Sequence, residues 1–173
     1  MVLPHGGPYE VSDSWGFDEE VQFLASRGYA VLQVNYRGSS GRGESYVQAG
    51  WKGWGTKIQD DIIDAVKWTI DQKMTDANRI CLFGASFGGY SALVQPVLNP
   101  GMYKCAIGYV GVYDLPLMRK TDNRNGQSDA TERFFARTLG TDDVALGKVS
   151  PALRAGDIKV PVMLVHGKDD KTA

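Results

Sequence analysis

The stretch "FGASFGGY", residues 83–90, places Ser86 between two glycines, Gly84 and Gly88, each two positions away. This spacing is typical of a nucleophile elbow, a sharp turn from a strand into a helix that lifts a serine Oγ clear of the backbone. Glycine is needed on both sides because a Cβ would collide with the turn. The chain has 21 glycines among 173 residues, so the pattern also arises by chance, and the surrounding sequence decides.

Apolar segments of strand length alternate with helical segments along the chain. The expected strands are rich in β-branched and aromatic residues and apolar almost throughout, as is typical of strands covered on both faces. They cover residues 29–36, 79–84, 104–112 and 160–167. The second of these runs directly into the turn at Ser86, which is the context that an elbow requires.

Three segments between these strands have helical character. Residues 17–28 repeat apolar side chains at helical spacing and stop at Gly28, a suitable C-terminal cap. Residues 56–73 carry apolar β-branched residues at every fourth position. A third helix begins just past Ser86, and Pro96 is expected to kink or end it. Strands alternating with helices predict the α/β class, with a doubly wound, mostly parallel sheet and helices on both faces.

Residues 114–150 interrupt this alternation. They are polar, and we predict one short helical segment near residues 131–139. We interpret residues 114–150 as a surface excursion. A chain of 173 residues suffices for one core and is short for two, so we predict a single domain over residues 1–173.

Composition excludes several classes of function. The formal net charge is −1 at pH 7, and no run of Lys and Arg marks a surface for nucleic acid or an anionic membrane. No apolar stretch approaches the roughly 18 residues that span a bilayer. No CxxC, HExxH or Walker motif appears, so we expect neither a metal nor a cofactor. We expect a soluble protein whose compartment the residues do not indicate. Cys81 and Cys105 both lie in apolar runs and are predicted to be buried free thiols.

In a doubly wound sheet, ligands bind beyond the carboxyl ends of the strands. A short opening strand, residues 2–4, is followed by "HGGP", residues 5–8, which is typical of the oxyanion loop of serine hydrolases. Gly7 would supply one backbone N–H and Phe87, just past the serine, the other. The alternative interpretation of "HGGP" is an ordinary Gly-Pro turn.

A carboxylate is needed to orient the catalytic histidine. Asp170, which follows the strand at 160–167, is our candidate, and its neighbour Asp169 lies one position early. Asp114 is a competing acid, although a capping or turn role is the more common use of an aspartate in that position. No histidine follows Asp170 in the sequence, and the two histidines present, His5 and His166, are less suitable bases because each position already has a structural use.

Together these motifs resemble the catalytic domain of prolyl oligopeptidase-type serine peptidases, a group that includes acylaminoacyl peptidases and dipeptidyl peptidases. The matching stretches occur in the family's order and approximate spacing. They are "HGGP", "NYRGSSGRGESY", "GWGTKIQDDIIDAVKW", "GASFGGYSAL", "GVYDL" and "SPALRAGDIKVPVMLVHGKDD". The resemblance covers nearly the whole chain and implies an α/β-hydrolase fold.

The resemblance also implies roles for individual residues. Ser86 corresponds to the nucleophile and Asp170 to the acid, three residues past Gly167. Gly7 and Phe87 correspond to the oxyanion donors. The resemblance as a whole implies that the parent protein is a peptidase acting on short peptides. Tyr36 and Arg37, in "NYRGSSGRG", are expected to help shape the substrate cleft. For Arg37 the alternative is a structural ion pair with Asp60 or Asp61.

Two departures from the family pattern carry expectations of their own. Family members have two further strands before the HGG strand, usually preceded by a β-propeller, and a catalytic histidine beyond the acid. We therefore expect the catalytic domain to be truncated at both ends and the isolated chain to be inactive. We also expect the strands at 29–36 and 160–167 to form exposed sheet edges through which the chain self-associates. The alternatives for function are a carboxylesterase of the same fold and a noncatalytic fragment.

Overall fold

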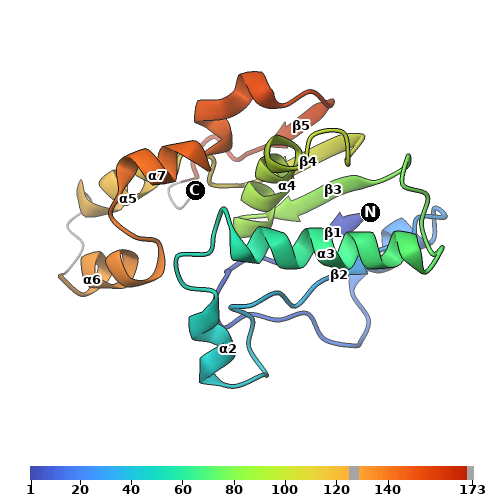
Figure 1. Cartoon of the computed structure of the whole chain (residues 1–173), viewed down its shortest axis with the longest axis horizontal. Helices are drawn as coiled ribbons and strands as arrows, with labels where there is room; N and C mark the ends of the chain where they lie inside the picture. The colour runs from blue at the N-terminus through green and yellow to red at the C-terminus, as the bar shows by residue number, and fades with distance from the viewer. Residues whose placement is uncertain (125–128, 171–173) are drawn as a thin grey trace.

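The computed structural model describes residues 1–124 and 129–170. Within them, a sheet of five strands has the order β2-β1-β3-β4-β5, and every neighbouring pair is parallel (Figure 1). The strands are β1 (Val2–Leu3), β2 (Leu32–Gln33), β3 (Cys81–Ala85), β4 (Cys105–Tyr109) and β5 (Val162–Val165). The parallel sheet confirms the predicted α/β class, and β2 and β5 lie at its edges as the resemblance implied.

β2 is much shorter than the predicted strand at residues 29–36. Only Leu32 and Gln33 pair, opposite Val2 and Leu3 of β1. Because β1 has only two residues itself, it offers no longer ladder for this edge strand to join. Tyr36 and Arg37 therefore follow the strand in a loop.

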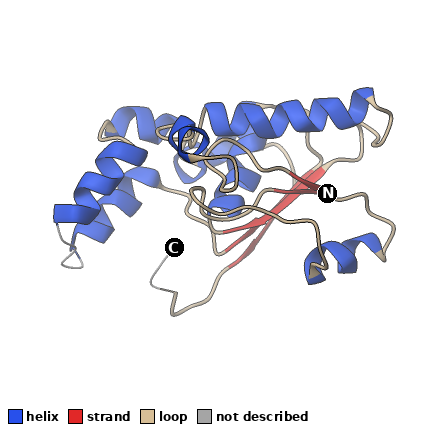
Figure 2. Cartoon of the chain, turned by 90° about the horizontal axis from the view of Figure 1, so that it is seen from below, coloured by secondary structure: helices blue, strands red, loops and turns tan. Residues whose placement is uncertain are grey.

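Helices lie on both faces of the sheet (Figure 2). α3, the longest helix in Figure 1, covers one face, and α1 lies on the opposite face. The helices are α1 (Glu19–Ala25), α2 (Glu44–Ala49), α3 (Lys57–Asp71), α4 (Phe87–Leu98), α5 (Leu115–Arg124), α6 (Asp129–Thr138) and α7 (Asp143–Lys148), with a 3₁₀ helix, η1 (Pro151–Asp157). Among the described residues, 1–124 and 129–170, no helix is both long enough and apolar enough to cross a bilayer.

The main core lies between the sheet and the helices α3 and α4. Leu82 of β3 and Ala106 of β4 are fully buried on this side, together with Ile58 and Ile62 of α3. The four-residue spacing of the α3 sequence thus gives a buried stripe, as predicted.

Two predicted helix boundaries need adjustment. Asp18 caps α1 by accepting the N–H of Val21, so Phe17 lies before the helix and is 82% exposed. Pro96 does not end α4, which continues to Leu98.

The prediction of a single short helix in residues 114–150 was wrong. The structure has α5, α6 and α7 there, each with a buried leucine: Leu115 begins α5, Leu139 follows α6 and Leu146 lies within α7. These helices are short and mostly polar, so their apolar periodicity is weak in the sequence. An ion pair between Arg119 of α5 and Asp143 of α7 joins two of them at 2.5 Å.

The prediction of free thiols was also wrong. Cys81 and Cys105 form a disulfide, with their Cα atoms 4.7 Å apart. They begin β3 and β4 and are directly opposite each other in the parallel register. Their positions in two apolar runs fitted either state, because only the pairing of the strands brings the sulfur atoms together.

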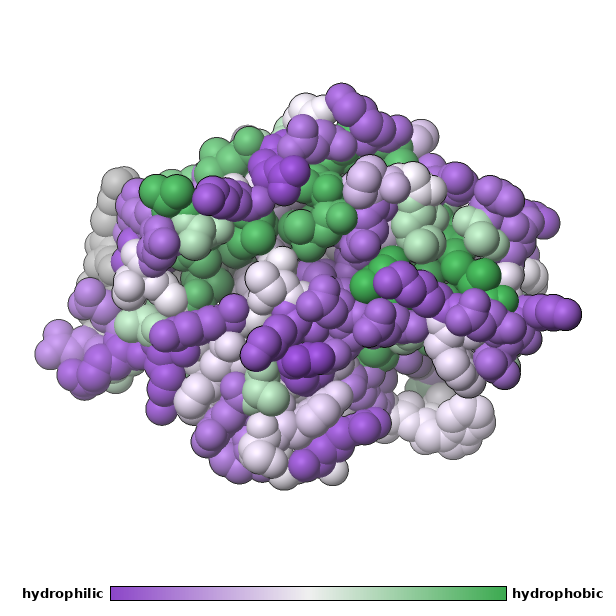
Figure 3. Space-filling model, viewed as in Figure 1, coloured by the Kyte–Doolittle hydropathy of each residue, from purple (hydrophilic) through white to green (hydrophobic). Residues whose placement is uncertain are grey.

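β5 presents an apolar edge. All four of its residues are exposed, with Met163 and Leu164 at 58% and 59%. On the face seen in Figure 3, hydrophobic residues gather in the upper half, where α4, α7 and η1 lie, and hydrophilic residues cover most of the lower half.

We predict that the β5 edge drives self-association. Leu164→Lys should lower the mass-averaged molecular weight at high protein concentration, because a charge on an edge strand opposes pairing with another strand. Sedimentation equilibrium measures this. Leu153→Lys is the matched control, since Leu153 is 58% exposed on η1 rather than on a strand. Equal association of the two variants would contradict the prediction.

We predict that the disulfide stabilises the fold. Replacing both cysteines by alanine should lower the free energy of unfolding by about 3 kcal/mol, because the 24-residue separation closes a loop in the unfolded chain. Urea unfolding with and without reductant measures this, and the loss should vanish when the wild type is reduced as well. Two titratable thiols in the unreduced, denatured wild type would refute the pairing.

Candidate active site

Ser86 has the backbone geometry of a nucleophile elbow. It directly follows β3 and caps α4, with φ 54° and ψ −122°, a conformation that residues other than glycine rarely adopt. The Ser86 N–H donates to the Tyr109 carbonyl at the end of β4 (3.0 Å), and its own carbonyl accepts the N–H of Tyr90 (3.0 Å). These bonds hold the strained backbone in place, and the residue itself is exposed between the half-buried Ala85 and the buried Phe87.

Both glycines of the motif are required by close contacts. A Cβ on Gly84 would lie 2.5 Å from the carbonyl carbon and oxygen of Gly88. A Cβ on Gly88 would collide with the carbonyl oxygen of Pro4, in the loop after β1. The G-x-S-x-G pattern is therefore a packing requirement of this turn rather than a chance occurrence.

The "HGGP" loop lies against the elbow. A Cβ on Gly6 would be 3.7 Å from the Cβ of Ser86, and Gly7 has a left-handed φ of 120°. Gly7 and Ser86 line the same cavity, of about 470 Å³. Phe87 is the first residue of α4, so its N–H points out of the helix start without an intrahelical acceptor. Its ring is buried and packs edge-on against Trp54 at 4.7 Å.

Apolar side chains from the 114–150 segment line much of this cavity. They are Met118 of α5, Phe134 and Phe135 of α6, and Leu139 after α6, and Val112, just before the segment, adds to them. Sequence reasoning missed them because the segment is polar overall. The adjacent phenylalanines in "TERFFARTL" were the available signal.

Asp170 follows β5, and Ser86 follows β3, at the carboxyl ends of the parallel strands. The Val110 N–H donates to the Val165 carbonyl (2.8 Å), so the ends of β4 and β5 are side by side, and β3 adjoins β4. The Asp170 side chain is mostly buried, and its Oδ2 lies 3.4 Å from Nε2 of His166. Asp169 is exposed.

Asp114 has a capping role. Its Oδ1 accepts the backbone N–H of Leu117 (2.9 Å) at the start of α5. This contact agrees with the alternative interpretation of Asp114 as a helix-capping residue.

His5 is fixed beneath the loop that it begins. Its Nε2 lies 2.8 Å from Oγ of Ser39, and its Nδ1 lies 2.7 Å from the Gly6 carbonyl oxygen. Its ring stacks on Tyr36, with centroids 4.2 Å apart. Burial lowers the pKa of the His5 imidazole and so favours its uncharged form.

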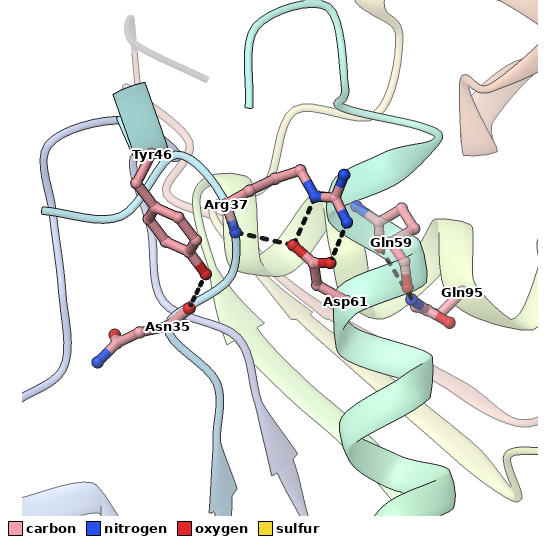
Figure 4. Close-up of polar contacts among 6 residues, drawn as sticks. All are labelled: Asn35, Arg37, Tyr46, Gln59, Asp61 and Gln95. Atoms are coloured by element: carbon pink, nitrogen blue, oxygen red, sulfur yellow. Dashed lines mark hydrogen bonds and ion pairs between the residues drawn. The ribbon is translucent and has the colours of Figure 1, made fainter. Parts of the chain in front are cut away.

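The structure gives Tyr36 and Arg37 structural contacts. Tyr36 is fully buried, and its hydroxyl donates to the carbonyl of His5 (2.8 Å). Arg37 pairs with Asp61 of α3 through its Nη2 at 2.5 Å and its Nε at 2.8 Å (Figure 4). Of the two aspartates considered in the ion-pair alternative, Asp61 is the partner. A role of Tyr36 and Arg37 in substrate binding stays a prediction.

Comparisons with known proteins test the expected family and fold. Residues 15–173 match the prolyl oligopeptidase family. The chain is 36% identical over 178 residues to dipeptidyl aminopeptidase BIII of Pseudoxanthomonas mexicana, an alignment that covers 98% of this chain and 25% of that protein. It is 39% identical over 181 residues to dipeptidyl peptidase family member 6 of Caenorhabditis elegans, covering 98% of this chain and 23% of that one.

Among solved structures, a Mycobacterium tuberculosis puromycin-hydrolyzing peptidase superposes with a TM-score of 0.85 at 29% identity, over 96% of this chain and 25% of that one. The chain thus spans about a quarter of the length of the relatives that it matches. All three are described as peptidases, so the carboxylesterase alternative is not favoured. The chain belongs to the prolyl oligopeptidase family of serine peptidases and has its α/β-hydrolase fold.

Proposed function

We propose that this chain carries the nucleophile of a serine peptidase that hydrolyses short peptides. The observation that carries the proposal is the strained, exposed Ser86, which shares a cavity with Gly7. Ser86 Oγ attacks the scissile carbonyl carbon while a histidine takes its proton, and the amine leaves with that proton to give an acyl-enzyme. Water, deprotonated by the same histidine, then releases the acid and restores the serine.

The backbone N–H groups of Gly7 and Phe87 are the proposed oxyanion donors. The contact between the Gly6 backbone and the elbow supports this assignment, because it brings the loop and the start of α4 to the same side of Ser86. Both groups belong to the main chain, so they are held by the fold and need no reorganisation as charge develops.

Asp170 is the proposed acid of the triad. β3 and β5 are separated by β4, so their ends lie about 10 Å apart, at two strand spacings. An imidazole fits between a serine and a carboxylate at such a separation. His5 is engaged by Ser39 and Tyr36, so we propose that the base is a histidine outside residues 1–173. His166, which contacts Asp170, is the alternative.

We propose that the apolar side chains from α5 and α6 accept an apolar side chain of the peptide, since Met118, Phe134 and Phe135 line the cavity at Ser86. Residues 1–173 are then one partial catalytic domain. The relatives are about four times longer than this chain, which is consistent with a further domain, and we propose a β-propeller from the family resemblance.

We predict that a fluorophosphonate labels Ser86 in a form of the protein extended beyond Ala173 and labels chain 1–173 only slowly. Phosphonylation needs an activated serine, and a chain without the base retains at most about 10³–10⁴-fold catalysis over water. Intact-mass spectrometry measures the adduct, with Ser86→Ala as the control. Rapid labelling of chain 1–173 at Ser86 would assign the base to His166 or His5, and His166→Gln would distinguish them. An adduct that survives Ser86→Ala would refute the nucleophile.

We predict that Asp170→Asn lowers kcat by about 10⁴-fold in the form that hydrolyses peptide, because the amide leaves the histidine in the wrong tautomer. Asp169→Asn is the matched control at the adjacent, exposed position, and Asp114→Asn tests the competing acid. Steady-state kinetics with a peptide anilide measures all three. A larger loss in Asp114→Asn than in Asp170→Asn would move the acid to the end of β4.

A further inference from the structure

The loop that carries Gly7 is held by a second loop, Tyr36–Ser39, which we call the support segment. The Tyr36 hydroxyl donates to the His5 carbonyl (2.8 Å), and the Ser39 Oγ lies 2.8 Å from the His5 ring. On the other side of Gly7, the Glu10 N–H donates to the Gly38 carbonyl (3.0 Å). The support segment therefore fixes the "HGGP" loop both before and after Gly7.

Such external contacts are needed because this loop has no regular structure of its own. Gly7 and Glu10 both have left-handed backbones, with φ of 120° and 60°. The two loops also touch closely, since a Cβ on Gly38 would lie 3.2 Å from the carbonyl oxygen of Pro8. Any movement of the support segment is therefore transmitted to Gly7.

Asp61 anchors the support segment to α3. Its Oδ2 accepts the backbone N–H of Arg37 (2.8 Å) and the Arg37 Nε–H (2.8 Å), while its Oδ1 accepts from Nη2 (2.5 Å). Figure 4 shows the carboxylate facing both the main chain and the guanidinium of Arg37. Because one of these bonds is to the main chain, Asp61 fixes the path of the support segment as well as one side chain.

The same helix is fixed to α4, which begins next to Ser86. Gln95 of α4 donates through Nε2 to the Gln59 carbonyl (2.8 Å) and lies 3.1 Å from the Gln59 Oε1. Gln59 in turn donates to the Trp54 carbonyl (2.7 Å) and to Ser91 Oγ (3.0 Å). Gln59 and Gln95 are almost fully buried, so this contact is sequestered from water.

We propose that Asp61 is a positioning residue of the oxyanion hole. α3 acts as a strut between the two proposed donors: the Gln59–Gln95 contact ties it to α4 and hence to the Phe87 N–H, and Asp61 ties it through the support segment to the Gly7 N–H. Asp61 does not line the cavity at Ser86, so it acts through Arg37 and not on the substrate. The role in catalysis rests on the proposed function, whereas the tie between α3 and the loop does not.

Asp61→Asn tests the tie without any assay of activity. The Asn keeps the size of the side chain but places an amide donor against the donors of Arg37. Exchange of the Glu10 amide hydrogen, read by NMR, should become about tenfold faster or more, as expected when a hydrogen bond to a charged group is lost. Asp64→Asn is the matched control on the same helix. The Asp64 side chain is exposed, and its contact is a surface ion pair with Lys67 at 3.6 Å, so this variant should leave the exchange rate of the Glu10 amide unchanged.

The kinetic readout tests the catalytic role. Relative to Asp64→Asn, Asp61→Asn should lower kcat by about tenfold or more, but by no more than the roughly 10²–10³-fold loss of a whole oxyanion donor, and leave KM little changed. Rates are expressed per folded molecule at a temperature well below unfolding. The double variant Asp61→Asn with Arg37→Gln should be no slower than the more impaired single variant, because both changes break one contact.

The outcomes separate the inference from the proposed function. Unchanged Glu10 exchange in Asp61→Asn overturns the tie, whatever happens to the rate. Faster exchange with an unchanged kcat overturns the role in the oxyanion hole and leaves Asp61 a structural residue. If no form of the protein hydrolyses peptide, the proposed function fails, and Glu10 exchange still decides whether Asp61 holds the loop.

Discussion

The structure depends on the close approach of the β3–α4 turn to the loop after β1. The contacts of Gly84 with Gly88, and of Gly88 with the Pro4 carbonyl, leave no space for a side chain. The chain must therefore turn within three residues, and Ser86 takes a left-handed backbone that its bonds to Tyr109 and Tyr90 hold in place. This turn exposes the serine and aims the first N–H groups of α4 at the same space.

The parts around Ser86 differ in how they are held. Ser86, the proposed nucleophile, joins the central strand β3 to the helix α4, and both elements are fixed by the core. The "HGGP" loop has contacts to other loops instead, and these lead through Arg37 and Asp61 to α3. The polar contacts of α3 therefore fix two elements around Ser86: those of Gln59 hold α4, and those of Asp61 hold the support segment. Fully satisfied hydrogen-bond networks specify one relative position of the elements that they connect.

The apolar side chains that line the cavity and the proposed catalytic residues come from different parts of the chain. Met118, Phe134 and Phe135 belong to the 114–150 segment, outside the alternation of strands and helices that carries Ser86 and Asp170. The arrangement separates the framework that holds Ser86 and Asp170 from a segment whose side chains line the cavity. In such an arrangement, changes in the segment alter the shape of the pocket without moving the serine.

The sequence by itself determined the α/β class and the elbow at Ser86, because these follow from local signals: apolar runs, helical spacing and glycines beside a serine. It left the ion-pair partner of Arg37 open between Asp60 and Asp61, wrongly predicted Cys81 and Cys105 as free thiols, and missed the helices α5 and α7. Only the tertiary structure decided these points. The register of β3 and β4 brings the two sulfur atoms together, and the packing of α3 against the support segment selects Asp61 over Asp60. Such contacts join residues 24 or more positions apart, and a pattern read along the chain carries no distance between them.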